Sequence, residues 1–293
     1  MFSRLPKAIL SSFLGSIFHD RVIDRVFPIH EDDSLSDLPV FVPNLLRGKL
    51  ALVTGGGTGI GFATARELGG LGARIIIAAR DFERLEKAVV ALESEGIEAH
   101  AHAVNIRDEN EVDALFEAIV HQHGLPDILV NNSGGQFEAP AAKISANGFR
   151  AVVDLNLNGT WHMSSTFGRR LLEAGKPGDI VNIAIVVSNG SPGYAHAAAA
   201  RAGVINLTKT LAREWGSAGI RVNAIAGGTI DTPALEQYDR ATLDAGIEKL
   251  PISRAGTARE MALAAVYLVS PAGAYTTGST LDVDGGEHMG GTW

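Results

Sequence analysis

The chain has 293 residues, of which 46% are hydrophobic and 20% charged, a balance typical of a globular protein that buries one large core. The formal net charge of −8, without clusters of Lys and Arg, argues against a nucleic-acid partner. The absence of cysteine excludes disulfides, thiolate metal sites and cysteine nucleophiles.

The N-terminal segment is predicted to be an amphipathic helix followed by a linker. Apolar residues recur at helical spacing between residues 9 and 26, which gives one apolar face. This face favours packing on the body of the protein or on a partner subunit, while peripheral membrane contact through residues 6–27 and a cleaved targeting segment are the alternatives. The acidic stretch Glu31 to Pro43 is interpreted as a linker. We therefore predict a helix and linker over residues 1–47 and one main domain over residues 48–293.

From Leu50 onward, short β-rich runs alternate with helical segments. The expected strands are Leu50–Val53, Arg74–Ala78, His100–Val104, Ile128–Val130, Ile180–Ile185, Arg221–Ile225 and Thr280–Val283. The expected helices between them include Phe62–Gly70, Arg84–Glu95, Asn110–Gln122 and Ala258–Leu268. Such alternation indicates βαβ units, so the predicted fold class is α/β, a doubly wound parallel sheet of the Rossmann type.

A glycine-rich motif over Thr54–Gly61 directly follows the first expected strand and opens the first helix. Glycines here let the backbone turn tightly and approach a pyrophosphate, whose charge then lies at the helix N-terminus. Because the motif has a strand before it and a helix after it, it predicts a dinucleotide-binding site. The predicted cofactor-binding residues of the motif are Gly55, Thr58, Gly59, Ile60 and Gly61.

The second expected strand is followed by Arg80 and Asp81. In dinucleotide-binding folds an acidic residue at this strand end binds the ribose hydroxyls, whereas an arginine accommodates a 2′-phosphate. Arg80 stands where the carboxylate is expected, so we predict NADP(H) as the cofactor. The less favoured alternative is NAD(H), with Asp81 on the ribose and Arg80 in solvent.

Residues 48 to 286 resemble a short-chain dehydrogenase/reductase. The resemblance rests on Thr54–Gly61, Asn131–Gly135, Asn156–Thr160, Gly227–Thr232 and Asp284–Gly286, which occur in the family's order. It implies that the segment Asn131 to Gly134, with Asn132, Ser133 and Gly134 among the cofactor-binding residues, lines the adenosine side. It also implies that Asn105 contacts the adenine edge and that Ile230 and Thr232 flank the nicotinamide amide.

The residues that carry the family's usual chemistry are replaced in this chain. That chemistry uses Ser, Tyr and Lys, with Tyr and Lys four residues apart on one helix so that the cation lowers the pKa of the phenol. Here the Tyr position is Ala197, the Lys position is Arg201, and the Ser position falls at Ala184 or Ile185. Of the usual four residues only Asn156 is retained. Arg201 is able to hold the nicotinamide ribose or a phosphate, but it does not give up a proton.

A site that binds the cofactor but lacks an acid for a carbonyl is better suited to reducing an activated C=C bond. Hydride then goes to the β-carbon, and hydrogen bonds stabilise the developing enolate. The stretches Asn132–Phe137, Ile144–Ser145 and His196–Val204 resemble peroxisomal-type trans-2-enoyl-CoA reductases and, more loosely, 2,4-dienoyl-CoA reductases. This resemblance implies an enzyme of fatty acid metabolism that reduces enoyl thioesters with NADPH. Two departures are Gly227 in place of the usual Pro and a C-terminus without a peroxisomal address.

Tyr194 and His196 are the candidate proton donors, with Ser188 as a weaker one. Each has a structural alternative: Tyr194 packs against the lid or a subunit interface, His196 begins a helix, and Ser188 is a turn hydroxyl. Two other functions stay open. The first is an alcohol or hydroxyacyl dehydrogenase with an unusual acid/base, and the second is a catalytically dead relative that binds a nucleotide.

The expected partner is a small-molecule substrate, with an acyl-CoA as one candidate, although the lid segment Pro233 to Pro251 contains no basic cluster for a CoA phosphate. The resemblance implies a homotetramer that pairs through Ala199 to Trp215.

No metal site is predicted, because the pairs His100/His102 and His121/His123 have no third ligand nearby in the sequence. No run of about 18 apolar residues predicts a membrane span. The absence of cysteine suits a reducing compartment, so we expect a cytoplasmic location, with organellar and membrane-peripheral locations left open.

Overall fold

The computed structural model describes residues 40–290, and residues 41–290 belong to one compact unit. Its centre is a parallel seven-stranded sheet in the order β3-β2-β1-β4-β5-β6-β9. The strand order reverses between β1 and β4, which both pair with their neighbours in parallel register. The strands are β1 (Leu50–Thr54), β2 (Arg74–Ala79), β3 (Ala99–Ala103), β4 (Ile128–Asn131), β5 (Gly178–Ile185), β6 (Ile220–Gly227) and β9 (Thr280–Val283).

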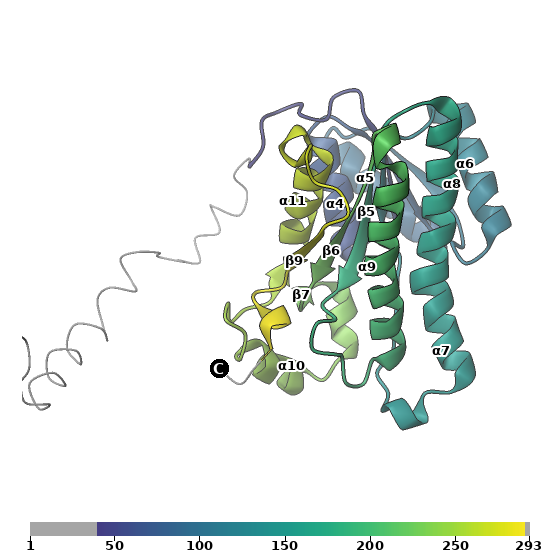
Figure 1. Ribbon diagram of the computed structural model, residues 1–293. Helices are drawn as coiled ribbons and strands as arrows, with labels where there is room; N and C mark the ends of the chain where they lie inside the picture. Colours follow the sequence, from purple (N-terminus) through teal and green to yellow (C-terminus); the bar gives the residue numbers. More distant parts are fainter. Residues whose placement is uncertain (1–39, 291–293) are drawn as a thin grey trace, which may run out of the picture. The chain divides into compact units, whose positions relative to one another are not determined.

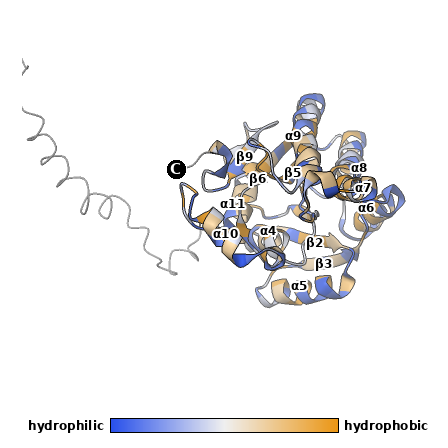
Figure 2. Ribbon diagram, turned by 90° about the horizontal axis from the view of Figure 1, so that it is seen from below, coloured by the Kyte–Doolittle hydropathy of each residue, from blue (hydrophilic) through white to orange (hydrophobic). Residues whose placement is uncertain are grey.

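Helices cover both faces of this sheet, as Figures 1 and 2 show. On one face lie α4 (Gly59–Gly70), α5 (Phe82–Ser94) and α11 (Ala258–Val269). On the other face lie α6 (Glu109–His123), α8 (Gly159–Ala174) and α9 (Ala195–Trp215). This is the doubly wound α/β fold predicted from the sequence, and the prediction is confirmed.

The sequence of β1 shows why the sheet is buried on both faces. Ala51 and Val53 pack into the core under α4, α5 and α11, whereas Leu50 and Leu52 pack into the core under α6, α8 and α9. Side chains alternate between the faces of a strand, so a strand covered on both sides must be apolar at every position. This explains the continuous apolar runs by which the strands were predicted.

The structure differs from the predicted elements between β4 and β5 and after β6. Residues 146–174 form two helices, α7 (Ala146–Val153) and α8, joined by a π-helical turn, η2 (Asp154–Asn158). The predicted lid segment contains the 3₁₀ helix η4 (Pro233–Gln237) and α10 (Arg240–Ile247). A small second sheet pairs β7 (Ile230–Asp231) with β8 (Gly256–Thr257). The remaining 3₁₀ helices are η1 (Ala141–Lys143), η3 (Gly216–Ala218), η5 (Pro271–Gly273) and η6 (Glu287–Met289).

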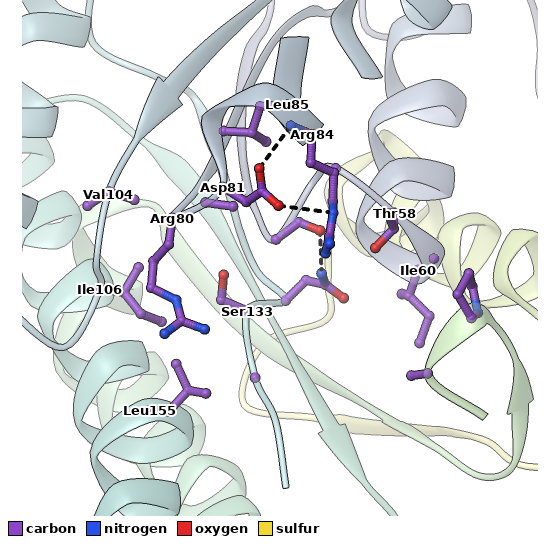
Figure 3. Close-up of a pocket in the computed structure, with 18 of the residues that line it drawn as sticks. Thr58, Ile60, Arg80, Asp81, Arg84, Leu85, Val104, Ile106, Ser133 and Leu155 are labelled. Carbon is purple, nitrogen blue, oxygen red and sulfur yellow. Dashed lines mark hydrogen bonds and ion pairs between the residues drawn. The ribbon is translucent and has the colours of Figure 1, made fainter. Parts of the chain in front are cut away.

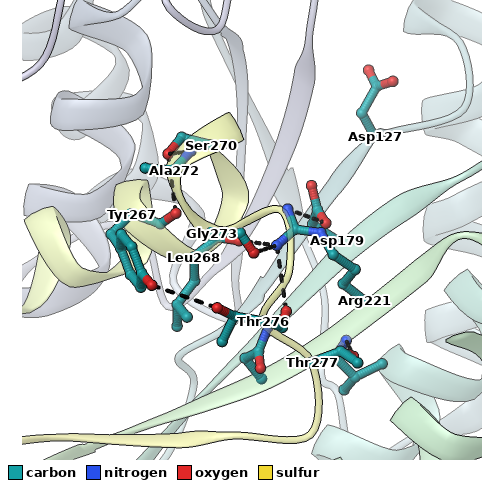
Figure 4. A network of polar contacts seen from close by, with 12 residues as sticks. Asp127, Asp179, Arg221, Tyr267, Leu268, Ser270, Ala272, Gly273, Thr276 and Thr277 are labelled. Atoms are coloured by element: carbon teal, nitrogen blue, oxygen red, sulfur yellow. Dashed lines mark hydrogen bonds and ion pairs between the residues drawn. The ribbon is translucent and has the colours of Figure 1, made fainter.

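A polar network lies at the end of the sheet where the amino termini of β5 and β6 meet, as Figure 4 shows. Arg221, at the start of β6, forms an ion pair with Asp179 at 2.8 Å and donates to the carbonyls of Leu268 and Gly273 at 2.6 Å. Burial raises the pKa of Asp179 to about 6, although Arg221 opposes the rise. The network connects β5 and β6 to the end of α11. It lies at the opposite end of the strands from the glycine-rich motif.

The predicted amphipathic helix within residues 6–27 lies outside the described residues, so the division at residue 47 stays a prediction. Leu46, near that predicted boundary, is buried, and its N–H donates to the carbonyl of Leu71 at 2.9 Å. Among the helices of residues 40–290, none combines the length and the hydrophobicity that crossing a bilayer requires.

Candidate functional site

A cavity of about 650 Å³ opens at the carboxyl ends of β1, β2 and β4, where the strand order reverses. In open α/β sheets this is the position at which ligands bind. Most of the predicted cofactor-binding residues line it, namely Gly55, Thr58, Gly59, Ile60, Arg80, Asn105, Asn132, Ser133, Gly134 and Thr232. The other three, Gly61, Arg201 and Ile230, do not line the cavity.

The glycine-rich turn between β1 and α4 has the backbone that the sequence predicts. Gly55 and Gly59 have φ angles of +64° and +54°, in the left-handed region that favours glycine. A Cβ on Gly61 would collide with the carbonyl of Gly55, so this glycine allows α4 to approach the turn closely. Its contribution is to packing rather than to the cavity wall. The free N–H groups at the start of α4 face the side on which a pyrophosphate binds.

The ends of β1 and β4 are joined by side chains. The Thr54 hydroxyl accepts hydrogen bonds from the N–H groups of Asn132 and Ser133, both at 3.0 Å. The Asn132 amide in turn donates to the carbonyls of Thr54 and Gly55 at 3.1 and 3.2 Å. Asn132 therefore holds the glycine-rich turn, and we infer that it shapes the cofactor site indirectly.

Two arginines, not one, lie at the end of β2 where a ribose phosphate would bind (Figure 3). Arg80 is exposed and forms no hydrogen bond or ion pair with any residue in the described range 40–290. Arg84 lines the same cavity one turn into α5. Asp81 caps α5 by accepting from the N–H of Arg84 at 3.1 Å, and its other oxygen lies 3.4 Å from Arg84 Nε. The carboxylate is thus already engaged by Arg84.

Part of the cavity wall is apolar. Val104 and Ile106 after β3 and Leu155 of η2 line it there, together with Asn105, whereas Leu85 lines it beside Arg84 and Asp81 (Figure 3). The side-chain oxygen of Asn105 accepts from Arg107 Nε at 3.0 Å, which leaves its amide N–H groups without a partner among the described residues. This arrangement is consistent with the predicted contact of Asn105 with an adenine edge.

Asn156 occupies the π-helical turn between α7 and α8 and is completely buried. Its amide donates to the carbonyls of Gly135 and Val152 at 2.7 and 2.8 Å, and its oxygen accepts from the N–H of Gly135 at 3.3 Å. The side chain thus pairs with both backbone groups of Gly135. Asn156 fixes the backbone just beyond Gly134, which lines the cavity.

Arg201 of α9 is a buried cation, 7% exposed, directly beneath this segment. Its Nη1 donates to the carbonyl of Ile183 at 2.6 Å, and its Nε has no hydrogen-bond partner. Burial lowers the pKa of Arg201 to about 10, so the group is still charged at neutral pH. Within residues 40–290 it has no carboxylate partner. A buried, unneutralised guanidinium attracts an anion or an electron-rich oxygen brought to the site.

The two predicted proton donors lie at the start of α9, in different surroundings. The Tyr194 hydroxyl donates to Glu138 Oε2 at 3.0 Å, and its ring meets that of Tyr238 edge-on, with centroids 6.1 Å apart. Burial raises the pKa of Tyr194 above its ordinary value, and the Glu138 carboxylate and the Tyr238 hydroxyl add to the rise. Tyr194 therefore contacts the lid, as its alternative interpretation expects. Ser188 is exposed.

His196 is completely buried under Phe137, whose ring meets it edge-on with centroids 4.4 Å apart. Its Nδ1 accepts from the N–H of Ala197 at 2.8 Å, and its Nε2 has no partner. Burial lowers the pKa of His196, which keeps the ring neutral. Ala197, which the sequence predicts to occupy the position of the family's tyrosine, is likewise completely buried.

Three residues near the site are not among the candidates predicted from the sequence: Arg84, Gln136 and Tyr238. The sequence predicts Arg84 only as the first residue of a helix; the detectable signal is Asp81, a residue type that favours the N-cap position three residues before it. Gln136 Nε2 donates to the Tyr238 hydroxyl at 3.3 Å across 102 positions of sequence. Local patterns do not encode such a contact.

The pair His100/His102 noted in the sequence has a third histidine, His123, beside it in the fold. His123, at the end of α6, stacks on His100 with centroids 4.3 Å apart and meets His102 edge-on at 6.0 Å. This trio lies at β3, the outermost strand beside β2, away from the cavity. In the part of the chain that the structure describes, no three His, Asp or Glu side chains are placed to hold a metal ion.

Comparison with known proteins places the chain in a single family. Residues 55–288 match the family model described as enoyl-(acyl carrier protein) reductase. A peroxisomal 2,4-dienoyl-CoA reductase of Arabidopsis thaliana is 38% identical, over 84% of this chain and 86% of that protein. A 3-oxoacyl-(acyl-carrier-protein) reductase of Pseudomonas aeruginosa is also 38% identical, over 83% of this chain and 99% of that protein.

Solved structures show the same fold. A putative 2-deoxy-D-gluconate 3-dehydrogenase from Agrobacterium tumefaciens, solved with bound NADP, superposes with a TM-score of 0.77 at 37% identity. The match covers 84% of this chain and 98% of that one. The unmatched part of this chain therefore amounts to about a sixth of its length.

Proposed function

Because the chain belongs to the short-chain dehydrogenase/reductase family, whose dienoyl-CoA reductases are among its relatives, we propose that this oxidoreductase uses NADPH to reduce the C=C bond of an enoyl thioester or a similar enone. The observation that carries the proposal is the pairing of a cofactor-sized cavity with a buried cation where the family's usual acid/base pair stands. Arg201 stabilises negative charge but does not exchange protons at neutral pH.

The residues around the cavity fit an NADP molecule. The start of α4 would hold the pyrophosphate, and the apolar side chains of Val104, Ile106 and Leu155 would contact the adenine. Arg80 and Arg84 would bind the 2′-phosphate, because both line the cavity and Asp81 is engaged by Arg84. The bound NADP in the Agrobacterium tumefaciens protein supports this choice over NAD.

The nicotinamide end of the cofactor would lie near Thr232 and Gly134, and the ribose would lie near Arg201. When bound, NADPH supplies a hydride for the β-carbon of the substrate. Arg201 would stabilise the negative charge that develops as hydride is transferred, acting through its field from a water-excluded position. Asn156 would keep the Gly134–Gly135 backbone in place during this step, since it pairs with both backbone groups of Gly135.

Oxidation of NADPH by purified protein tests the proposal. The substrates are a trans-2-enoyl-CoA, a 2,4-dienoyl-CoA and a 3-oxoacyl-CoA, each also tested with NADH. We expect turnover of the enoyl or dienoyl thioester with NADPH and a saturated C–C bond in the product by mass spectrometry. Turnover of the 3-oxoacyl thioester alone would replace the proposal with a carbonyl reductase. Cofactor binding without any turnover would leave a nucleotide-binding, non-catalytic protein.

We further propose that the protein is a cytoplasmic homotetramer that pairs partly through α8 and α9. Trp161 and Leu172 of α8 are 45% and 44% exposed, which suits a surface that a second subunit covers. Sedimentation of the purified full chain measures the assembly. A Trp161→Asp variant that stays tetrameric would exclude this surface.

A further inference from the structure

Three segments meet beside the cavity, and two of them continue from residues that line its wall. The first passes Gly134 and reaches Gln136 and Glu138. The second leads from Thr232 through η4 to Tyr238, and the third begins α9 at Tyr194. The N–H of Ala139 donates to the carbonyl of Gly193 at 2.9 Å, which fastens the first segment to the third.

The side chains at this meeting point form a continuous polar row. Gln136 Nε2 donates to the Tyr238 hydroxyl at 3.3 Å, the Tyr238 ring lies edge-on to the Tyr194 ring, and the Tyr194 hydroxyl donates to Glu138 at 3.0 Å. Glu138 is exposed, whereas Gln136, Tyr194 and Tyr238 are half-buried. The row thus extends from solvent to Gln136, two residues beyond Gly134 of the cavity wall, and to Tyr238, four residues beyond Ala234 of the same wall.

The contacts in this row indicate which of Tyr194, His196 and Tyr238 has a proton available for transfer to a substrate. The Tyr194 proton is engaged by the Glu138 carboxylate. His196 lies sealed under Phe137 and has no solvent contact through which to regain a proton. Tyr238 accepts from Gln136 through its oxygen, and no acceptor other than the neighbouring Tyr194 hydroxyl engages its proton within the described residues.

We propose that Tyr238 of the lid is the proton donor of the reaction and that it regains its proton from solvent, since it is only half-buried. This inference rests on the proposed function. The β-carbon would receive a hydride from bound NADPH, the two-electron reductant that leaves as NADP⁺, and the C=C π-electrons would form the enolate. The Tyr238 O–H bond then breaks, and its proton forms the new C–H bond at the α-carbon. The resulting phenolate takes a proton from solvent, which restores the Tyr238 hydroxyl.

The role also explains why the acid stands on the lid. Tyr238 directly follows η4, so a lid that covers the bound substrate would bring the phenol to it, and proton donation and exclusion of water would occur together. Gln136 positions the phenol because its amide N–H donates to the phenol oxygen, and the same bond stabilises the phenolate that is left behind.

Tyr238→Phe tests the proposal, with Tyr275→Phe as the matched control because Tyr275 is fully exposed. With a trans-2-enoyl-CoA, we expect kcat of Tyr238→Phe to fall by about 10²- to 10⁴-fold, the scale of general-acid catalysis, with the NADPH Kd and melting temperature unchanged. The control should match the wild type. A Tyr238→Phe variant that loses only substrate affinity, with kcat within about threefold of wild type, would mean that Tyr238 merely closes the lid.

A stereochemical readout separates an acid from a structural residue. Reduction of a 2-methyl-2-enoyl-CoA makes the α-carbon a stereocentre, so a fixed donor yields one isomer and water yields a mixture. We expect one isomer from the wild type and a mixture from Tyr238→Phe. One isomer from both enzymes would overturn the proposal. If the wild type reduces no enoyl thioester at all, the proposed function fails instead, so the two failures are distinguishable.

Discussion

The Nη2 atom of Arg201 lies against Gly134, at the position that any side chain on residue 134 would occupy. The same Cβ would lie 2.7 Å from the Asn156 oxygen. Neither neighbour is free to move, because Arg201 is buried and bonded to Ile183, and Asn156 is bonded to Gly135 and Val152. The backbone that lines the cavity and the buried cation therefore depend on each other.

Gly134→Ala should destabilise the fold by about 1–3 kcal/mol, the usual cost of forcing extra volume into a packed site. It should also weaken NADPH binding, since the segment that lines the cavity must shift. Gly135→Ala is the matched control, because a Cβ on Gly135 meets only Leu155, at 3.4 Å. Chemical denaturation and fluorescence titration measure both effects. Equal stability of the two variants would show that the Arg201 side chain yields without cost.

Replacement of Arg201 should separate stability from function. Arg201→Met removes a buried charge that has no carboxylate partner among the described residues, so stability should stay within about 1 kcal/mol of the wild type or increase. Turnover should fall by about 100-fold or more, since the stabilising cation is gone. Arg201→Lys keeps the charge and should retain more activity than Arg201→Met. An Arg201→Met enzyme with normal kcat would remove Arg201 from the proposed chemistry.

The sheet was predictable from sequence because its strands are buried on both faces, which leaves apolar runs that need no knowledge of their partners. The glycine-rich motif was likewise local, since Gly55 and Gly59 need only their own backbone conformation to be recognised. The Gln136–Tyr238 contact joins residues 102 positions apart, and no periodic pattern records it. The burial of His196 was also unpredictable, because the residue that covers it, Phe137, belongs to the loop after β4, far from α9 in the sequence.

The choice of cofactor provides a third prediction. A double variant, Arg80→Ser with Arg84→Ala, should raise the Kd for NADPH by about 10- to 100-fold, since each charge-assisted hydrogen bond contributes about 1.5–3 kcal/mol before solvent screening. The Kd for NADH should change by less than about threefold, because NADH carries no 2′-phosphate. Lys87→Ala, an exposed change on the same helix α5, is the control. Parallel loss of NADPH and NADH binding would show that the arginines hold the fold of the site and not the phosphate.

The histidine trio should make the protein less stable in mild acid. Burial, followed by repulsion from His100, lowers the pKa of His102 and His123 below the ordinary value of 6.5; His123 also feels Arg74, while Glu98 opposes the shift. The unfolded chain therefore binds protons that the folded chain rejects, so stability is full above pH 6.5 and is lost as the pH falls through that value. Because the rings are partly exposed, we expect a loss of no more than about 1 kcal/mol.

Urea denaturation at pH 7.5 and 5.5 measures this loss, and His123→Gln should reduce it by removing one titrating ring and its repulsion of the other two. His121→Gln is the control, since His121 is exposed on the same helix α6 and belongs to no ring contact in the described residues. If His121→Gln and His123→Gln flatten the pH dependence equally, the loss comes from the general charge of the protein and not from the stacked rings.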